Sequence, residues 1–354
     1  MPSGKNPAYF YSAVCAGAPL PLFVMRSPDN TAPGICIISH KMIPLLRDTI
    51  APAERCKWIF VDTVQGYGFP KNSWADLHML GDPRLKDTYI EAGVTVPFTE
   101  IDDGGDFVDE ELFYSNPDTQ VTYDVILIAS WAKFKNHILL VQAIAALKKK
   151  GVFCSTLVVG SYCVPGHMAT IEEARSYEYG IREYVNRHHL PVTFGGGGGV
   201  IENQDGSTSL GLYDKSHVRD LICSARIGVL VSMQEGTARF PAECLLCDRP
   251  ILLLENLQGG TRKYCTASTG LAVGALPDAV ATGIAELLET AQEKTPRRSY
   301  LTQFGSRRSS HNLIRAIAQI DNRISPEIQF RPYRGDLWGT DYYNRFLPSL
   351  QMTP

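Results

Sequence analysis

The sequence has no long hydrophobic run, no marked excess of either charge and no signal-peptide pattern. Across its 354 residues, no apolar stretch approaches the roughly 18 residues that a membrane-spanning helix needs. The 34 basic and 37 acidic residues give a formal net charge of −3, so the basic excess of a general nucleic-acid binder is missing. The N-terminus carries one early Lys5 and an interrupted apolar stretch, which matches a signal peptide poorly. We therefore expect a cytoplasmic protein that binds no nucleic acid.

The nine cysteines do not predict a disulfide framework, because their number is odd and they are scattered along a long chain. Cys244 and Cys247 form a C-x-x-C pair, a spacing that serves redox chemistry or half of a zinc site in other proteins. Neither a second C-x-x-C nor an H-x-x-x-H is present to complete four zinc ligands. We expect both cysteines to be buried in a helix.

From about residue 121 onward, short apolar runs alternate with helical patterns. The runs are bounded by turn residues, as buried parallel strands are. Strands are predicted at 123–129, 155–160, 191–194, 227–232 and 250–255. Helices are predicted at 137–150, 170–189, 215–225, 241–248 and 277–294, the last with Asp278 as N-cap. Strands that alternate with helices over this length predict a doubly wound parallel sheet.

The first 120 residues repeat the strand–helix alternation less regularly. Strands are predicted at 20–25, 34–39, 56–62 and 94–102, and helices at 41–50 and 82–93. Residues 1–120 therefore predict a second, smaller α/β domain, and the acidic, turn-rich stretch 102–120 predicts the linker. Two α/β domains with a cleft between them place ligands at the carboxyl ends of their strands.

The segment VSMQEGTARFPAECLLCDRP (231–250) suggests a binding site for an anion. A strand ends near Ser232 and a helix begins near Pro241, which suits a first helical turn. The amides at this helix start attract anions, and Gly236 permits close approach. A diphosphate on these amides would have Glu235 and Glu243 on either side to accept hydroxyl hydrogen bonds. Two sugars joined by a diphosphate have that layout; carboxylates that only complement the helix dipole are the alternative.

This segment and its neighbours resemble family 4 glycosyltransferases, which have the GT-B fold of two Rossmann-like domains facing a cleft. EGTARFPAE (235–243) is similar to the family's E-x7-E motif, and ILIASWAKFKNHILLVQAIAAL (126–147) resembles its G-R-L-x-x-x-K-G strand–loop–helix. CDRPILLLENLQGGTRKYCTASTGLAV (247–273) resembles the later strand, loop and return strand. The match covers about residues 121–295 in the expected order. It implies a small acceptor domain (1–120), a nucleotide-sugar domain (121–325) and a C-terminal segment (326–354) that crosses back.

The resemblance also implies a reaction and roles for residues. The reaction is transfer of a hexose, with retention, from a UDP- or GDP-sugar to a hydroxyl of a saccharide or small metabolite. It needs no cofactor and no metal, and the sequence contains no D-x-D, the metal motif of the other major glycosyltransferase fold. Glu235 would contact the donor sugar and Lys135 would neutralise the departing diphosphate. The remaining donor-side residues are Glu243 at the ribose, the amides of Gly236, Thr237 and Ala238, and Gly160.

The sequence departs from the family pattern at several positions. The family's arginine falls on Ser130, and Lys133 is a candidate to replace its charge. On the acceptor side, the family's histidine has no direct match, so His40, Asp62 and Thr63 are the candidates. Five glycines at 195–199 do not fit a phosphate-binding pattern and predict a loop beside the nucleotide. These departures leave open a non-catalytic nucleotide-sugar-binding protein or a nucleotide-sugar epimerase.

Overall fold

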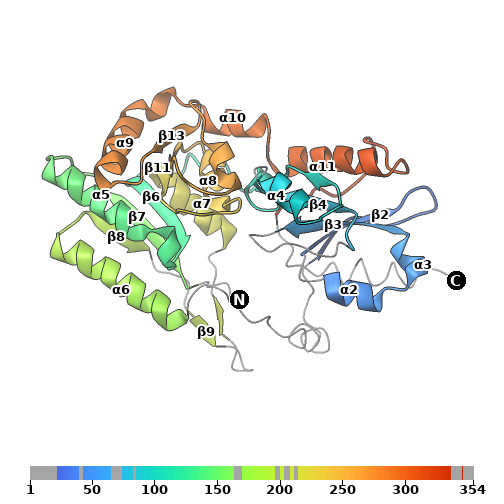
Figure 1. Cartoon of the computed structure of the whole chain (residues 1–354). Coiled ribbons are helices and arrows are strands. Elements are labelled where there is room, and N and C mark those ends of the chain that lie inside the picture. The colour runs from blue at the N-terminus through green and yellow to red at the C-terminus, as the bar shows by residue number, and fades with distance from the viewer. Residues whose placement is uncertain are drawn as a thin grey trace. The chain divides into compact units, whose positions relative to one another are not determined.

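The computed structural model describes residues 22–39, 43–64, 74–82, 85–162, 170–195, 200–202, 208–210, 214–335 and 345 (Figure 1). The chain divides into two compact units. The first contains the described residues up to Phe107 and those from Phe304 onward; the second is Val108–Gln303. These bounds differ from the expected division at residues 121 and 325. Each unit is built around one large sheet.

The first sheet has the order β1-β2-β3-β4-β5, in which β2 to β5 are parallel and β1 is an antiparallel edge strand. Its strands are β1 (Leu22–Arg26), β2 (Gly34–Ser39), β3 (Trp58–Val64), β4 (Leu77–Leu80) and β5 (Phe98–Thr99). Its helices are α2 (Ile43–Thr49), α3 (Pro52–Arg55), α4 (Lys86–Glu91) and α11 (Ser306–Ile320). β4 has no counterpart among the predicted strands, because four buried residues are too few to show an alternating pattern.

The two faces of the first sheet carry separate apolar clusters. In β2, Ile35 and Ile37 pack in the cluster that contains α11, whereas Cys36 and Ile38 pack in the cluster that contains α2. This alternation follows from the two-residue period of a strand, and it places the two helices on opposite faces (Figure 1). Leu313, Ile314 and Ile317 share the buried side of α11. Their burial on the first sheet is why α11 belongs to the first unit and not to the expected 121–325 domain.

The second sheet is fully parallel, with the order β13-β12-β11-β6-β7-β8. Its strands are β6 (Tyr123–Ser130), β7 (Thr156–Ser161), β8 (Val192–Gly195), β11 (Ala225–Leu230), β12 (Ile251–Leu254) and β13 (Gly270–Val273). A separate two-stranded sheet pairs β9 (Val200–Glu202) with β10 (Thr208–Leu210). The predicted doubly wound sheet is therefore present.

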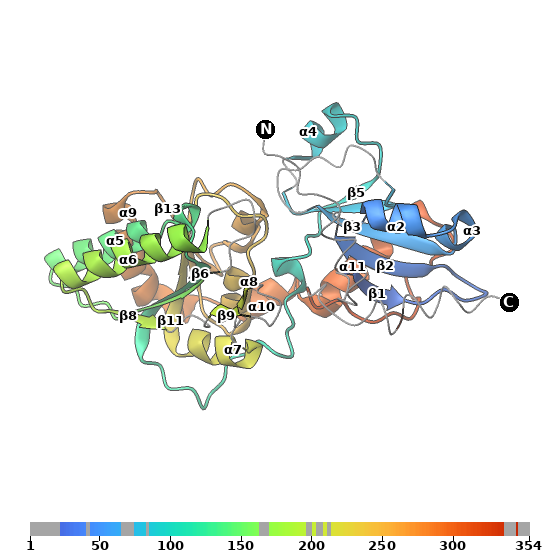
Figure 2. The same ribbon diagram turned by 90° about the horizontal axis from the view of Figure 1, so that it is seen from below.

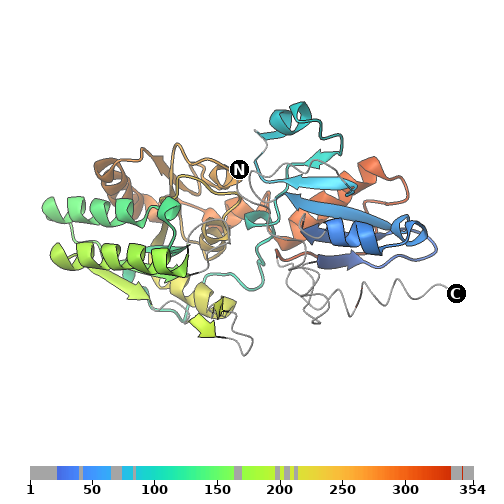
Figure 3. The same ribbon diagram turned by 60° about the horizontal axis from the view of Figure 1, so that its bottom comes forward.

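The helices of the second unit form two groups. α5 (His137–Lys149) packs beside α6 (Ile171–Arg187) and α9 (Pro277–Thr290), and α5 and α6 run side by side as the green helices of Figure 3. α8 (Arg239–Leu246) packs against α7 (Lys215–Cys223) and α10 (Pro296–Leu301), and Figure 2 shows this second group away from α5 and α6. Within the described ranges, no helix combines the length and the apolar composition needed to cross a bilayer.

The order of the second sheet defines a switch point. β7 and β8 follow β6 on one side, whereas β11, β12 and β13 extend from β6 on the other side. The strand order therefore reverses between β6 and β11, where the two loops that leave the carboxyl ends of these strands diverge. Open α/β sheets bind ligands at such a point.

Three local expectations need correction. α8 begins at Arg239 rather than near Pro241, so Glu243 lies in the second helical turn and not the first. The N-cap of α9 is Leu276, whose side chain makes no cap bond, and Asp278 lies inside the first turn. The predicted linker 102–120 contains the 3-10 helix Gly105–Phe107, and the side chains of Phe107, Val108 and Phe113 in it are fully buried. Acidic turn residues in a packed loop have the same composition as a solvated linker, so the pattern did not separate the two.

We expect Ile317→Ala to destabilise the protein by about 2–5 kcal/mol, because the side chain is fully buried between α11 and the first sheet. Ile320→Ala on the same helix is the matched control, since Ile320 is 38% exposed. Urea unfolding of the full chain measures both variants. Equal effects of the two substitutions would show that α11 does not pack through this face.

Candidate functional site

Three loops of the second unit meet at the carboxyl ends of β6, β11 and β12, which are neighbours in the sheet. Backbone hydrogen bonds tie them together. The Met233 amide donates to the Phe134 carbonyl at 3.2 Å, and the Gln258 amide donates to the Met233 carbonyl at 3.0 Å. The Glu235 amide donates to the Gln258 carbonyl at 2.8 Å. The loop that carries Glu235 is thus held on both sides, at the switch point of the sheet.

Lys135 and Glu235 form an ion pair between two of these loops. Lys135 Nζ lies 2.6 Å from Glu235 Oε1 and 2.7 Å from Oε2, so both carboxylate oxygens are engaged. The side chains are 17% and 7% exposed, respectively. Asn136 follows with φ 57°, a left-handed conformation that asparagine tolerates well and that ends the 3-10 helix Lys133–Lys135 before α5 begins. The structure brings together these two predicted catalytic residues.

The loop from Gly236 to Ala238 is bound to the 3-10 helix Gly260–Tyr264. The Thr261 amide donates to the Gly236 carbonyl at 3.0 Å, and the Ala238 amide donates to Thr261 Oγ1 at 2.7 Å. The amide of Ala238, expected to face a donor, is therefore engaged by Thr261 in this structure. Gly236 is exposed and Thr237 is buried. Sequence reasoning missed Thr261, and a threonine inside a loop gives no signal by which to find it.

Gly259 allows the closest backbone approach in the site. Its φ is 105°, a backbone conformation that residues other than glycine rarely adopt. A Cβ at this position would lie 1.4 Å from the carbonyl oxygen of Glu235. Both the positive φ and the absence of a Cβ are therefore needed for the loop after β12 to contact the loop that carries Glu235.

Glu243 lies one turn beyond Arg239 on α8. Arg239 Nε is 3.4 Å from Glu243 Oε1. Burial raises the pKa of Glu243, while the positive charges of Arg239 and Lys215 act in the opposite direction. Arg239 was not among the predicted site residues, although it stands inside the segment EGTARFPAE. The two carboxylates of that segment gave the sequence signal, and its single cation, Arg239, was missed.

Trp131 and His137, on either side of Lys135 in the sequence, pack against each other. The Trp131 ring is centred 4.6 Å from the His137 ring, and both residues are buried. Gly160 leaves room for this tryptophan, since a Cβ there would lie 2.0 Å from the indole. Gly160 therefore faces Trp131 rather than an open donor site. Burial, assisted by the charge of Lys135, lowers the pKa of His137 to about 3.

Ser130 stands where the family has an arginine, and Lys133 is the candidate to replace the charge of that arginine. The two residues lie close in sequence but differ in environment. Ser130 ends β6 beside Ser161 of β7 and carries no charge. Lys133 begins the 3-10 helix and its side chain is exposed. Of the two lysines in this helix, Lys135 is the one that pairs with Glu235.

The acceptor-side candidates belong to the first unit. Asp62 and Thr63 are buried in the second half of β3, and Asp62 Oδ2 lies 3.3 Å from Nδ1 of His78 on β4. The two residues are paired in the register of the parallel strands. His78 was missed because β4 itself was not predicted. His40 and the glycines 196–199 lie outside the described residues.

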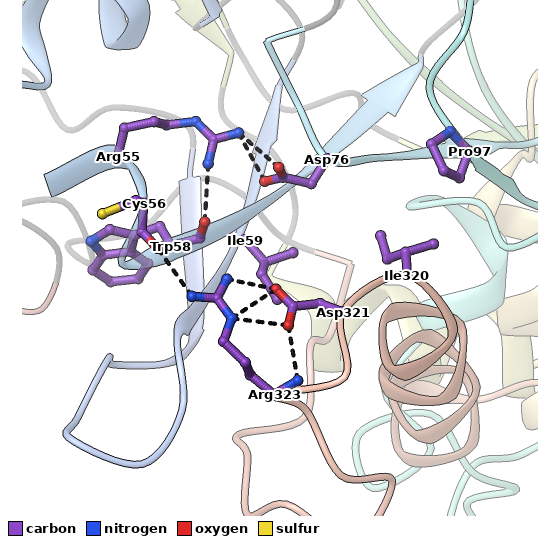
Figure 4. Close-up of a pocket in the computed structure, with 9 residues that line it drawn as sticks. All are labelled: Arg55, Cys56, Trp58, Ile59, Asp76, Pro97, Ile320, Asp321 and Arg323. Carbon is purple, nitrogen blue, oxygen red and sulfur yellow. Dashed lines mark hydrogen bonds and ion pairs between the residues drawn. The ribbon is translucent and has the colours of Figure 1, made fainter. Parts of the chain in front are cut away.

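The first unit contains a pocket of about 400 Å³, which is separate from the candidate site of the second unit (Figure 4). Trp58 and Ile59 line it, so it opens at the amino end of β3, opposite to the edge at which parallel sheets bind ligands. Its cations are already matched by anions: Arg55 contacts both oxygens of Asp76 at 2.9 Å, and Arg323 pairs with Asp321. The Arg55–Asp76 pair and the hydrogen bond that Arg323 Nη1 donates to the Cys56 carbonyl join separate segments of the chain around the pocket, so these charges have a structural role.

Comparison with known proteins relates the fold to solved structures. No protein-family model and no curated protein matches the sequence. Sucrose-phosphate synthase from Thermosynechococcus elongatus matches with a TM-score of 0.57 and 18% identity, over 80% of this chain and 73% of that chain. Anabaena Alr3699/HepE, solved with UDP and glucose, matches with a TM-score of 0.57 and 14% identity, over 80% and 78% of the two chains.

A glycosyltransferase from Rickettsia africae also matches, with a TM-score of 0.56 and 16% identity, over 79% of this chain and 80% of that chain. The predicted fold class is therefore confirmed: the protein is α/β, with two Rossmann-like sheets that match GT-B glycosyltransferase structures. At these identities the likeness concerns the fold.

We expect Gly259→Ala to displace the Glu235 loop, because the new Cβ would collide with the Glu235 carbonyl and the residue would have to keep a positive φ. Thermal unfolding should show destabilisation of more than about 1 kcal/mol. Gly180→Ala is the control, since Gly180 lies inside α6 with open space where its Cβ would stand. That substitution should be neutral or stabilising; a destabilisation as large as that of Gly259→Ala would contradict our account.

We expect acid to destabilise the second unit through His137. Its pKa is about 3 in the folded protein, against about 6.5 in an unfolded chain, so between these values only the unfolded state binds the proton. Stability from this group is complete above about pH 6.5 and falls as the pH is lowered. Between pH 7 and pH 5 the loss is on the order of 2 kcal/mol. Urea unfolding should show a flatter pH dependence for His137→Phe and His137→Gln than for the unmodified protein; unchanged slopes in both variants would disprove the assignment.

Proposed function

We propose that the protein is a retaining glycosyltransferase related to family 4. It transfers a hexose from a UDP- or GDP-linked donor to a hydroxyl of a saccharide or small metabolite. The observation that carries the proposal is the Lys135–Glu235 ion pair at the switch point of the second sheet. The GT-B-like fold and the order of the motifs along residues 121–295 support it.

The ion pair has the chemistry that such a reaction requires. A donor contributes sugar hydroxyls, which donate to carboxylates, and a diphosphate, which attracts cations. On donor binding, Glu235 accepts from the sugar while Lys135 turns to the diphosphate. Negative charge on the diphosphate grows as the glycosidic bond breaks, so a cation in contact with the diphosphate stabilises the transition state more than the ground state. In the absence of donor, each charge neutralises the other.

The surrounding elements supply the rest of the donor site. α8 begins immediately after Ala238, so its positive dipole end faces the diphosphate position in our proposal. Glu243 accepts from the ribose of the nucleotide. Lys135 and the positive end of α8 face the diphosphate, and in our proposal the reaction needs no metal ion. Asp62 and Thr63 are retained as acceptor-side candidates.

A nucleotide-binding test comes first. Thermal shift with UDP, GDP, ADP and dTDP should raise the unfolding temperature for UDP or GDP, because a ligand that binds only the folded state stabilises it. Donor hydrolysis or transfer in EDTA then tests catalysis. Ser130 in place of the family's arginine favours one alternative, a non-catalytic protein that binds the nucleotide sugar. Such a protein would show the thermal shift but neither donor hydrolysis nor transfer. Donor isomerisation without acceptor would instead indicate an epimerase.

We expect Lys135→Ala to lower kcat by about 10²-fold or more and to change KM much less, because the lysine meets charge that develops in the transition state. Lys149→Ala, an exposed lysine at the other end of α5, is the matched control and should behave as the unmodified protein. Steady-state kinetics of transfer measures both. A silent Lys135→Ala together with an inactive Lys133→Ala would move the catalytic cation to Lys133.

A further inference from the structure

The charge count of the proposed donor site is incomplete with Lys135 alone. A nucleoside diphosphate sugar brings two negative charges in its bridging diphosphate, and Glu235 adds a third when Lys135 leaves it. Ser130 at the end of β6 contributes no charge, and Lys133 is exposed. A second cation is therefore required near the loop Gly236–Ala238. This argument rests on the function proposed above.

Arg239 stands where local helix energetics disfavour it. It is the first residue of α8, and the first turn of this helix contains no acidic residue. The amino end of a helix carries partial positive charge, so a cation there is repelled. Its partner Glu243 follows four residues later, which is the less favourable order for an ion pair on a helix.

The ion pairs of α6 show the opposite arrangement. There Glu178 precedes Arg182, and Glu183 precedes Arg187, each by four residues. Both α6 pairs thus follow the order that the helix dipole favours. Arg239 breaks a rule that the same protein obeys elsewhere, and such exceptions are expected at functional sites.

The geometry around Arg239 suits an anionic ligand. Its side chain is 28% exposed, so it is accessible while partly shielded from water. Its contact with Glu243 at 3.4 Å is longer than the 2.9 Å contacts of Arg55 with Asp76 in the first unit. A planar guanidinium can donate two parallel hydrogen bonds to phosphate oxygens, which an ammonium cannot reproduce.

The loop between the two cations contains a polar group that needs a partner. Only Gly236, Thr237 and Ala238 separate Glu235, paired with Lys135, from Arg239. The Thr237 hydroxyl is buried, and within the part of the chain that the structure describes no hydrogen-bond partner faces it. Buried hydroxyls are rarely left without a partner, so this hydroxyl is available for a hydrogen bond to a ligand group at the same loop.

We propose that Arg239 is a donor-binding residue that supplies the second positive charge to the nucleotide diphosphate. Lys135 meets the diphosphate from the β6 side and Arg239 meets it from the start of α8. Glu243 Oε1 holds the guanidinium in place when no donor is bound. The ligand class is a nucleoside diphosphate or its sugar ester, and the contact of Arg239 is with the phosphates rather than with the nucleoside.

Calorimetric titration tests the assignment. The probes are UDP or GDP, whichever the unmodified protein binds, with the corresponding monophosphate and nucleoside. Arg239→Ala should weaken diphosphate binding by on the order of 10–100-fold and leave nucleoside binding unchanged. Arg239→Lys should recover part of the loss, because it restores charge without the bidentate geometry. Arg187→Ala removes an arginine from a pair with glutamate on α6 and should have no effect.

The outcomes separate this inference from the proposed function. Diphosphate binding that is unchanged in Arg239→Ala would overturn the inference, as would an equal loss of diphosphate and nucleoside affinity, which indicates a structural role. A selective loss in Lys133→Ala with none in Arg239→Ala would assign the second cation to Lys133 and also overturn it. In all three cases the proposed donor site stands. An unmodified protein that binds no nucleotide overturns both.

Discussion

The Lys135–Glu235 ion pair is the interaction on which the rest of the candidate site depends. Both side chains are largely buried and both carboxylate oxygens contact one ammonium group. Separating two such charges without a replacement is costly, because each would remain desolvated and unpaired. A ligand that brings both hydroxyl groups and negative charge can replace both partners at once. The pair therefore leaves neither buried charge without a counter-charge, and in our proposal a sugar joined to phosphate is the ligand that replaces both partners.

The pair can form only because three loops are held at one edge of the second sheet. The Met233–Phe134, Gln258–Met233 and Glu235–Gln258 backbone hydrogen bonds join the loops that follow β6, β11 and β12. Gly259 permits this approach because it has no Cβ to strike the Glu235 carbonyl. Neighbouring parallel strands place such loops together, and the reversal of strand order leaves space between two of them. The sheet topology thus creates the site, and the loop contacts give it its geometry.

α8 combines a structural and an electrostatic role. Its buried side packs into the core through residues such as Cys244 and Leu245, and Gly228 of β11 leaves room for the Cys244 thiol. Its amino end carries Arg239 against the helix dipole. Packing in the core compensates for the unfavourable charge placement at the exposed end. An element anchored in this way can hold a cation where an isolated helix would reject it.

Much of the second unit could be predicted from the sequence. The regular alternation from 123–129 onward predicted its parallel sheet. The spacing of Glu235 and Glu243 indicated one segment of the candidate site, and the resemblance to family 4 glycosyltransferases indicated the segment that carries Lys135. The first sheet was harder to read, because β4 has only four residues and β5 has two, which are too short for a periodic signal. For the same reason His78, the buried partner of Asp62, could not be found from the sequence.

Local pattern by itself determined most strands and helices of the second unit, because burial on one face imposes a period that remains visible in the residues. Tertiary structure alone decided that α11 packs on the first sheet, since an apolar helix face fits more than one sheet. Tertiary structure alone also decided that Lys135 pairs with Glu235, which is 100 residues away in the sequence. The same holds for the hydrogen bond that the Ala238 amide donates to Thr261 Oγ1. Contacts between distant loops depend on strand order, and strand order is set by packing of the whole domain rather than by any one segment.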